Sequence, residues 1–332
     1  MKDEDCVPGL MHTVFAGYRI RDVKVVAAFD VNRLKIGKDV AEAIFIEPNV
    51  CAKFAEVQPL GVEVLPAPIL DSVAPHMEEP FKVYDRSKIN APDVAKTLEE
   101  SGAEMLLNYI PVGSNEATKF YADACLKAGC AFVNCIPEFI ASDSVWARKF
   151  KEARLPVAGD DIKSQVGATI LHRVLTKLMI DRGVKIDETY QLNLGGDTDF
   201  LNMTVEERLS SKRVSKTEAV TSLLPYKIPT RIGPSDYVPF LGDAKICYIH
   251  LKGRKFGDRP IKIDVKLSVE DSPNSAGVAI DLIRAVKVAL DRGISGPLLS
   301  ISAYAFKHPP IQTDEDTARR WVEEYIQGIR ES

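Results

Sequence analysis

SNEATKFYADACLKAGCAFVNC, residues 114–135, decides the fold class of this chain. Its first part places small and apolar residues at the spacing of one helix face: Ala117, Phe120, Tyr121, Ala124, Cys125 and Ala128. Ser114 is of a type that caps helix N-termini, and Gly129 stands where a helix end takes a left-handed residue. The apolar run at 131–135 then predicts a buried strand. A helix that leads directly into a buried strand is a unit of a parallel α/β sheet.

The same alternation runs through the rest of the first half. Strands are predicted at 24–29, 105–110 and 155–158, and helices at 36–45, 92–100 and around Trp146. Residues 46–90 are rich in proline and predict a long irregular excursion. Strands that alternate with helices predict an α/β fold with a doubly wound parallel sheet.

Beyond residue 161 the pattern changes to longer strands. Strands are predicted at 189–194, 245–251, 260–269 and 298–304, and helices at 169–181, 276–290 and 314–326. Within 260–269 the apolar residues alternate strictly with polar ones, which is typical of a sheet with one face in water. These elements predict a second domain of the α+β class.

Composition narrows the class of protein. The 332 residues carry a net charge of −4, which argues against a general nucleic-acid binder. No apolar run reaches the roughly 20 residues that cross a bilayer, and no signal peptide is visible, so the cytosol is expected. The six cysteines form no C-x-x-C pair, and the five histidines show no ligand spacing. Reduced thiols are therefore expected, and no metal site built from histidines or thiolates, while a divalent ion held by ligand oxygens and an aspartate stays open.

The chain has no G-x-G-x-x-G turn near its start, although a doubly wound domain that binds a dinucleotide usually begins with one. Gly9, Gly17 and Gly37 stand alone. Asp30 nevertheless ends a predicted strand, where an acidic residue accepts hydrogen bonds from an adenosine ribose. The alternative role for Asp30, as a cap of a turn, is equally compatible with the spacing.

Lysines and aspartates in the C-terminal half give the best functional signal. They fall in 212–216 (KRVSK), 242–245 (GDAK), 270–275 (EDSPNS) and 306–309 (FKHP), each at the edge of a predicted element. Side chains at such edges can converge on one pocket. A pocket lined by lysines suits a phosphate group and a developing oxyanion, whereas each lysine taken alone is better explained as a solvated surface charge.

Taken together, these segments resemble the bacterial, actinobacterial-type inositol-3-phosphate synthase family, also called myo-inositol-1-phosphate synthase. The resemblance covers residues 7 to 310. Its most specific segments are 108–114 (NYIPVGS), 132–143 (FVNCIPEFIASD), 159–165 (GDDIKSQ), 193–203, 211–216 and 271–277. It implies bound NAD, a homotetramer and three parts: a Rossmann-like domain at 1–163, a catalytic and oligomerisation α+β domain at 164–271, and a C-terminal segment at 272–332 that returns to the first.

Two departures from the family accompany the resemblance. The family carries its glycine loop, with the first strand and helix, upstream of the segment that resembles residues 7–12. In the usual strand order that first strand lies in the middle of the sheet, so its loss would expose an edge on both neighbours. We therefore expect roughly 30 to 40 further residues upstream of Met1. The second departure is Asp197, where the family usually has Asn; an added carboxylate there either alters cofactor affinity or pairs with a lysine.

The resemblance implies an isomerisation of D-glucose 6-phosphate to 1D-myo-inositol 3-phosphate, as a step of inositol and phosphatidylinositol biosynthesis. In this reaction NAD takes hydride from C5, an enolate forms at C6 and attacks C1, and the hydride returns. By motif, the catalytic set is Lys212, Lys216, Lys245, Lys307, Asp160, Asp243 and Asp271. The expected NAD contacts are Asp30, Asp39, Tyr121, Ser164, Asp199 and Lys212, and the expected substrate contacts are Ser164, Asn274, Lys245 and Lys307.

Individual roles follow from lysine chemistry. Lys212 and Lys216, four residues apart and so on one helix face, are expected to polarise the C5 oxygen and relay protons. Lys245 and Lys307 are expected to contact the phosphate group and the developing oxyanion. The alternative role of Ser164 and of Asn274 is to cap the helix that follows each of them. The alternative role of Tyr121 is packing in the core. Two other functions stay open: a non-catalytic relative that acts as an oligomeric partner, and another NAD-dependent sugar-phosphate oxidoreductase.

Overall fold

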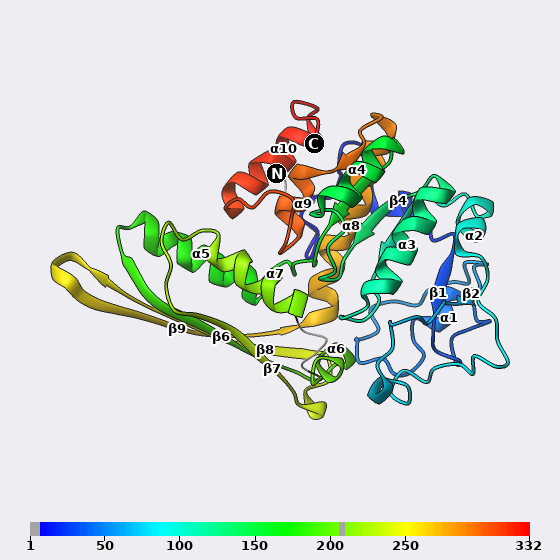
Figure 1. Ribbon diagram of the computed structural model, residues 1–332, viewed down its shortest axis with the longest axis horizontal. Helices are drawn as coiled ribbons and strands as arrows, with labels where there is room; N and C mark the ends of the chain where they lie inside the picture. The colour runs from blue at the N-terminus through cyan, green and yellow to red at the C-terminus, as the bar shows by residue number, and fades with distance from the viewer. Residues whose placement is uncertain (1–6, 206–209) are drawn as a thin grey trace.

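A computed structural model describes residues 7–205 and 210–332 of the chain. Its elements form two parts (Figure 1). One part holds the parallel sheets with most of the helices, and the other is a long mixed sheet that extends to one side below α5 and α7. Within the described ranges, no helix is long and apolar enough to cross a membrane.

The larger parallel sheet has the strand order β10-β5-β4-β3, with every neighbouring pair parallel. Its strands are Gly296–Pro297, Pro156–Gly159, Ala131–Asn134 and Met105–Asn108. Because alternate residues of a strand point to opposite faces, Phe132 and Val157 pack against α2 (Val94–Glu100), α3 (Asn115–Ala128) and α4 (Ser144–Glu152). Val133 and Ala158 pack on the opposite side. Both faces are covered, as predicted for a doubly wound sheet.

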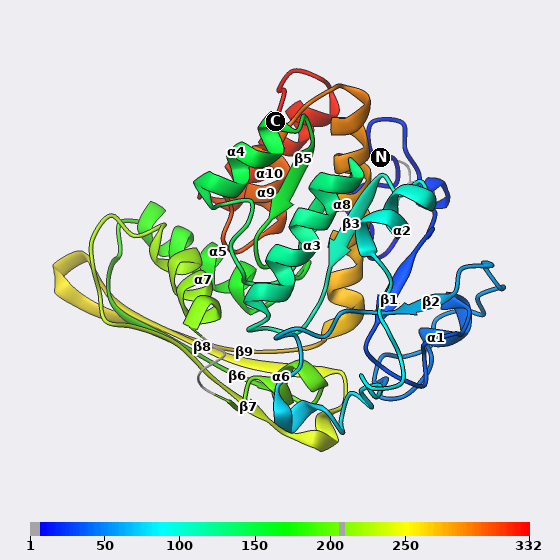
Figure 2. The same ribbon diagram turned by 45° about the vertical axis from the view of Figure 1, so that its right-hand side comes forward.

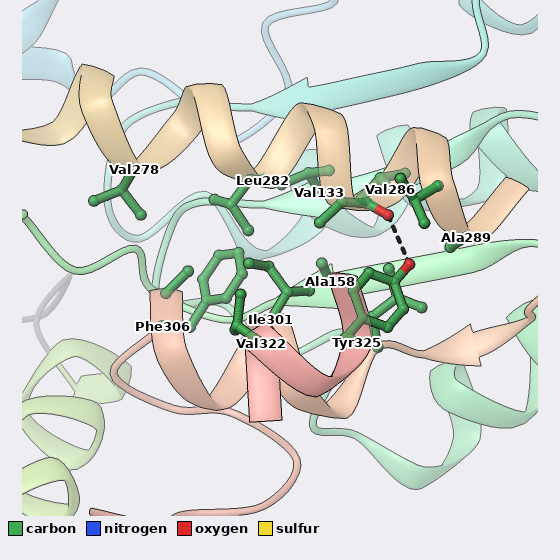
Figure 3. Packing of buried hydrophobic residues seen from close by; sticks show 14 of the residues in the cluster. Val133, Ala158, Val278, Leu282, Val286, Ala289, Ile301, Phe306, Val322 and Tyr325 are labelled. Atoms are coloured by element: carbon green, nitrogen blue, oxygen red, sulfur yellow. Dashed lines mark hydrogen bonds between the residues drawn. The ribbon is translucent and has the colours of Figure 1, made fainter. Parts of the chain in front are cut away.

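The second face is covered by three C-terminal helices: α8 (Asp271–Asp291), α9 (Leu299–Ala305) and α10 (Glu315–Ile326). Figure 3 shows their side chains meeting those of β4 and β5. The Tyr325 hydroxyl donates a hydrogen bond to the Ala285 carbonyl at 2.8 Å, which joins α10 to α8. The end of the chain therefore packs on strands formed by its first half.

The predicted single sheet is in fact divided. β1 (Ala28–Asp30) pairs in parallel with β2 (Val64–Pro66), and α1 (Val40–Ala43) follows β1. No hydrogen-bonded ladder joins β1 to β3 among the described residues. This arrangement leaves one edge of β1 and one edge of β3 without a ladder partner among the described residues.

Several local predictions were wrong. Residues 298–304 form helix α9 rather than a strand, because a short apolar run that is buried on every side carries no decisive period. The predicted helix at 36–45 is the single turn α1, and 24–27 lie outside β1. The Ser114 hydroxyl does not cap α3 but donates to the Pro111 carbonyl. The N–H groups of Glu116 and Ala117, in the first turn of α3, donate to the Asp71 carboxylate instead. Gly129 does end α3 in the left-handed conformation, with φ of 70°.

The mixed sheet has the order β7-β6-β8-β9. Its strands are Thr230–Tyr237, Lys185–Gly195, Ala244–Lys255 and Arg259–Glu270, so three predicted strands are confirmed and β7 was missed. Helices α5 (Ala168–Asp181) and α7 (Ser210–Thr221) lie on one face in both views (Figures 1 and 2). The short helix α6 (Thr198–Asn202) follows β6. Short 3-10 turns occur at Ile20–Asp22, Pro75–Met77, Pro239–Leu241 and Phe256–Asp258.

Candidate active site

A cavity of about 380 Å³ lies where the two parts of the fold meet, and all four predicted lysines line it. Lys212 and Lys216 come from α7, four residues apart as predicted. Lys245 stands near the start of β8, and Lys307 follows α9. Four segments far apart in the sequence thus bring their ammonium groups to one space.

Strand pairing explains how the β-sheet contributes. β6 and β8 are antiparallel, and Gly195 at the end of β6 is the register partner of Lys245. The segment after β6, which carries Asp197 and Asp199, therefore lies beside Lys245. β9 is antiparallel to β8, so its end brings the first residue of α8, Asp271, to the same edge.

Three of the lysines are held by carboxylates. Lys212 Nζ lies 2.8 Å from Asp199 Oδ2, Lys245 Nζ lies 2.8 Å from Asp271 Oδ2, and Lys307 Nζ lies 2.8 Å from Asp161 Oδ1. These pairs fix the positions of the side chains and keep the charge balanced in a space that is partly shielded from water.

Lys216 differs from the other three. Its Nζ lies 3.5 Å from Ser235 Oγ, and no carboxylate among the described residues is within ion-pair distance of it. Burial lowers the pKa of Lys216 well below its usual value, and the positive charges of Lys212, Lys245 and Lys307 lower it further. A lysine whose pKa is lowered holds more free amine at a given pH and therefore accepts a proton from a bound ligand more readily.

The pKa values of the paired groups move differently. Burial acts to lower the pKa of Lys245, but the carboxylates of Asp271, Asp199 and Asp197 together outweigh burial and raise it. For Lys307 burial prevails over Asp161, so its pKa is lowered. Burial acts to raise the pKa of Asp161 and Asp199, yet the neighbouring lysines lower both. The cavity therefore holds a fixed cation at Lys245 and a titratable amine at Lys216.

Adjacent aspartates 160 and 161 have opposite surroundings. The Asp160 carboxylate is buried and accepts from the side chains of Asn134 and Ser142, at 2.7 Å each, and from three backbone N–H groups at 140–142. Burial raises its pKa. Asp161, with φ of 62°, carries its carboxylate to Lys307 and Ser215 in the cavity. The structure therefore places Asp161, which was not singled out from the sequence, beside the lysines. Asp160, which was predicted to be catalytic, does not line the cavity.

Three other predicted residues lie outside the cavity lining. Asp243 accepts from the Ser272 N–H and hydroxyl, at 3.2 and 2.6 Å, and so fixes the start of α8. The Asn274 amide exchanges two hydrogen bonds with the Val166 backbone, at 3.0 and 2.8 Å, and the residue lies within α8 rather than at its cap. Asp39 caps α1 and accepts from the N–H groups of Leu60 and Gly61.

A second cavity, about 580 Å³ in volume, lies between the unpaired edges of β1 and β3. Asp30 and Tyr121 line it, and Asp30 also accepts from the Asn32 N–H at 2.8 Å, so both roles foreseen for Asp30 are compatible with its position. The two cavities share five lining residues: Phe81, Tyr109, Ile110, Pro111 and Thr198. The two cavities are therefore continuous. Ser164, Asp199 and Lys212 line the lysine cavity.

Polar residues on β6 were also missed. Gln191 and Asn193 are buried, line the lysine cavity and hydrogen-bond to each other at 2.9 Å. Their signal was present in the sequence, since polar residues two apart on a strand point to the same face. Within residues 7–205 and 210–332, no cluster of three or more His, Cys, Asp or Glu side chains could hold a metal ion.

Comparison with known proteins agrees with this geometry. The sequence model of the family described as myo-inositol-1-phosphate synthase matches residues 167–272. Over 329 residues the chain is 53% identical to inositol-3-phosphate synthase of Mycobacterium tuberculosis, covering 98% of this chain and 89% of the relative. The enzyme of the same name from Corynebacterium glutamicum is 49% identical over 330 residues, covering 97% and 90%.

A solved structure gives the same result for the fold. A myo-inositol-1-phosphate synthase-related protein from Thermotoga maritima is 27% identical, with a TM-score of 0.78, and the alignment covers 92% of this chain and 87% of that one.

Proposed function

The chain belongs to the inositol-3-phosphate synthase family, and from that premise we propose that the lysine cavity converts D-glucose 6-phosphate to 1D-myo-inositol 3-phosphate. The observation that carries the proposal is the convergence of Lys212, Lys216, Lys245 and Lys307 on one cavity. The reaction needs an anchor for a dianion, positive charge beside an oxygen that gains charge, and a proton acceptor. A set of lysines with unequal environments can provide all three.

The unequal environments divide the roles. Lys216, with its lowered pKa, is proposed as the proton acceptor at C6. Lys212, held by Asp199, is proposed to polarise the C5 oxygen. Lys245, whose pKa is raised, stays charged and suits the phosphate, and Lys307 suits the C1 oxygen as it becomes an alkoxide. Asp161 and Asp271 hold these last two ammonium groups in place.

NAD is proposed as the cofactor, and the residues present fit it. Asp30 offers a carboxylate to a ribose, and Tyr121 lines the same cavity. Ser164, Asp199 and Lys212 are placed for the nicotinamide end. When bound, NAD supplies the hydride acceptor and donor for C5. Asp39 is not proposed as a direct contact, because its carboxylate is bonded to backbone N–H groups of its own loop.

Domain limits, assembly and location complete the proposal. We propose domains at 1–163 and 164–271 with a segment at 272–332 that returns to the first; packing of α8, α9 and α10 on β4 and β5 supports that return. A homotetramer is proposed through the sheet face opposite α5 and α7. The cytosol is proposed as the compartment, because all five cysteines of the described ranges are free thiols.

The test is product formation by the purified chain. Glucose 6-phosphate and catalytic NAD are supplied, and the inositol phosphate is identified by NMR while NADH is followed by absorbance. The proposal expects inositol phosphate with no net NADH. Lys216→Met should abolish the product, whereas Lys96→Met, at an exposed lysine of α2, should not.

Other outcomes would point to the alternatives. Net NADH formed in proportion to substrate would indicate a sugar-phosphate oxidoreductase. Failure to bind NAD, measured by calorimetry on folded protein, would favour a non-catalytic partner.

A further inference from the structure

Asp197 is a carboxyl group of the lysine cavity that no lysine neutralises. Its two carboxylate neighbours, Asp199 and Asp271, each have a lysine at 2.8 Å. Asp197 Oδ1 instead accepts from the Phe200 N–H at 3.0 Å, as the cap of α6. No Lys, Arg or His of the described ranges is within ion-pair distance of it.

The backbone leaves Asp197 little freedom to move away. A Cβ atom on Gly195 would meet the Phe200 ring at 2.3 Å, and one on Gly196 would meet the Gly242 N at 2.4 Å. The turn that ends β6 is thus packed against the turn that begins β8. Together with the cap to Phe200, this packing holds the Asp197 side chain at the cavity wall, near Lys245.

We propose that Asp197 is a ligand-contacting residue that works as a neutral acid, donating a hydrogen bond to an oxygen of the anion held by the lysines and repelling that anion once ionised. The charged groups that act on it are Asp199 on its own helix, Asp271 at the start of α8 and Lys245 on β8. Burial and the Asp199 charge raise the pKa of Asp197 to about 6. The neutral acid is therefore available in slightly acidic solution, and the repelling carboxylate prevails above neutrality.

The inference rests on the anion site of the proposed function, and a probe that does not titrate tests it directly. Sulfate keeps its charge across the range in which Asp197 ionises, so its binding by calorimetry reports on the protein alone. Asp197→Asn and Asp197→Ser both remove the charge and keep an oxygen that can cap α6. All four lysines are present in the three proteins, so the ratio of affinities compares the cavity with and without the Asp197 carboxyl group.

The expected result is a ratio that depends on pH. The affinity of the unmodified chain for sulfate, divided by that of either variant, should fall about tenfold from about pH 5 to about pH 8. One added negative charge several ångströms from the anion accounts for a change of about this size. Equal ratios at both pH values in both variants would overturn the role of Asp197 while leaving the anion site intact. Absence of sulfate binding in all three folded proteins would overturn this inference and the anion site together.

Discussion

At the scale of single residues, the placement of Lys216 makes the sharpest prediction. Its amine lies among three other lysines, and no carboxylate of residues 7–205 or 210–332 pairs with it, so the free base should be the active form. Lys216→Met should lower kcat by about 10²–10⁴-fold, the range of general-base contributions. The rate of the unmodified enzyme should rise with pH through the lowered pKa of this lysine, since deprotonation creates the acceptor. A stopped assay across pH on both proteins checks this, and a retained rate in the variant would contradict it.

The two adjacent aspartates give a second prediction at this scale. Asp160→Asn would place an amide donor among five donors, so unfolding free energy should drop by about 2–4 kcal/mol while the folded fraction keeps its activity. Asp161→Asn should instead reduce kcat/KM by about 100-fold, because Lys307 loses its countercharge. Urea unfolding and initial rates on the same preparations separate the two. An inactive but fully stable Asp160→Asn protein would return the catalytic role to Asp160.

At the scale of elements, a buried ion cluster joins α5 and α10 to the site. Glu315 on α10 lies 3.0 Å from Lys163 Nζ and 2.5 Å from Arg173 Nε, and all three groups are largely buried. Arg173 also donates to the Ala219 carbonyl of α7, the helix that carries Lys212 and Lys216. Glu315 therefore holds two cations, of which Arg173 contacts the site helix α7 and Lys163 contacts the Ala303 carbonyl of α9.

Glu315→Gln should lower the unfolding free energy by about 3–5 kcal/mol, because two buried cations lose their countercharge. Burial already lowers the pKa of Lys163 to about 8, so the loss should be smaller in alkaline solution, where Lys163 sheds its proton more readily. Glu324→Gln is the matched control on α10, since its 3.8 Å pair with Arg320 is exposed and should be worth under about 1 kcal/mol. Equal effects of the two substitutions in chemical denaturation would refute the role of the cluster.

His12 ties the N-terminal segment to two helices. Its ring nitrogens contact Asp281 on α8 and Glu323 on α10, the latter at 3.3 Å. Burial acts to lower the pKa of His12, but these carboxylates outweigh it and raise the pKa above 6.5. A raised pKa stabilises the fold fully below the unfolded value and loses this effect as pH rises through the folded value. Urea titrations should therefore show stability that declines above about pH 6.5, and His12→Gln should flatten that decline.

The elements also show how far sequence reasoning reaches. The helices observed at 115–128, 168–181 and 315–326 were predicted to within about a residue, because apolar residues recur there at the period of a helix face. Strand β7 was missed because Gly233 and Pro234 interrupt its pattern, and α9 was misread because it is buried on all sides. The four lysines were found through their motifs. Asp160 and Asp161 could not be told apart, since their directions depend on a backbone angle that sequence does not display.

At the scale of the whole molecule, one face of the mixed sheet is not covered by helices of the described residues. Figures 1 and 2 show α5 and α7 against one face, while Tyr190, Leu192 and Tyr248 lie on the other with 38–40% of their surfaces exposed. Strands with alternating faces pack sheet against sheet, so this face suits a second copy of the chain. One such contact builds a dimer, and a second contact through another surface would complete the proposed tetramer.

The assembly prediction follows from that face. A Tyr190→Glu and Tyr248→Glu double variant places two charges among apolar side chains, so light scattering should report a smaller particle than the unmodified chain gives at the same concentration. Phe256→Glu is the matched control: this side chain is 99% exposed, but it lies at the tip of the β8–β9 hairpin, away from the face. If Phe256→Glu alone dissociates the assembly, the hairpin tip and not the open face is the contact. Because β6 and β8 carry this face on one side and cavity residues on the other, loss of assembly should also lower activity by loosening the lysine cavity.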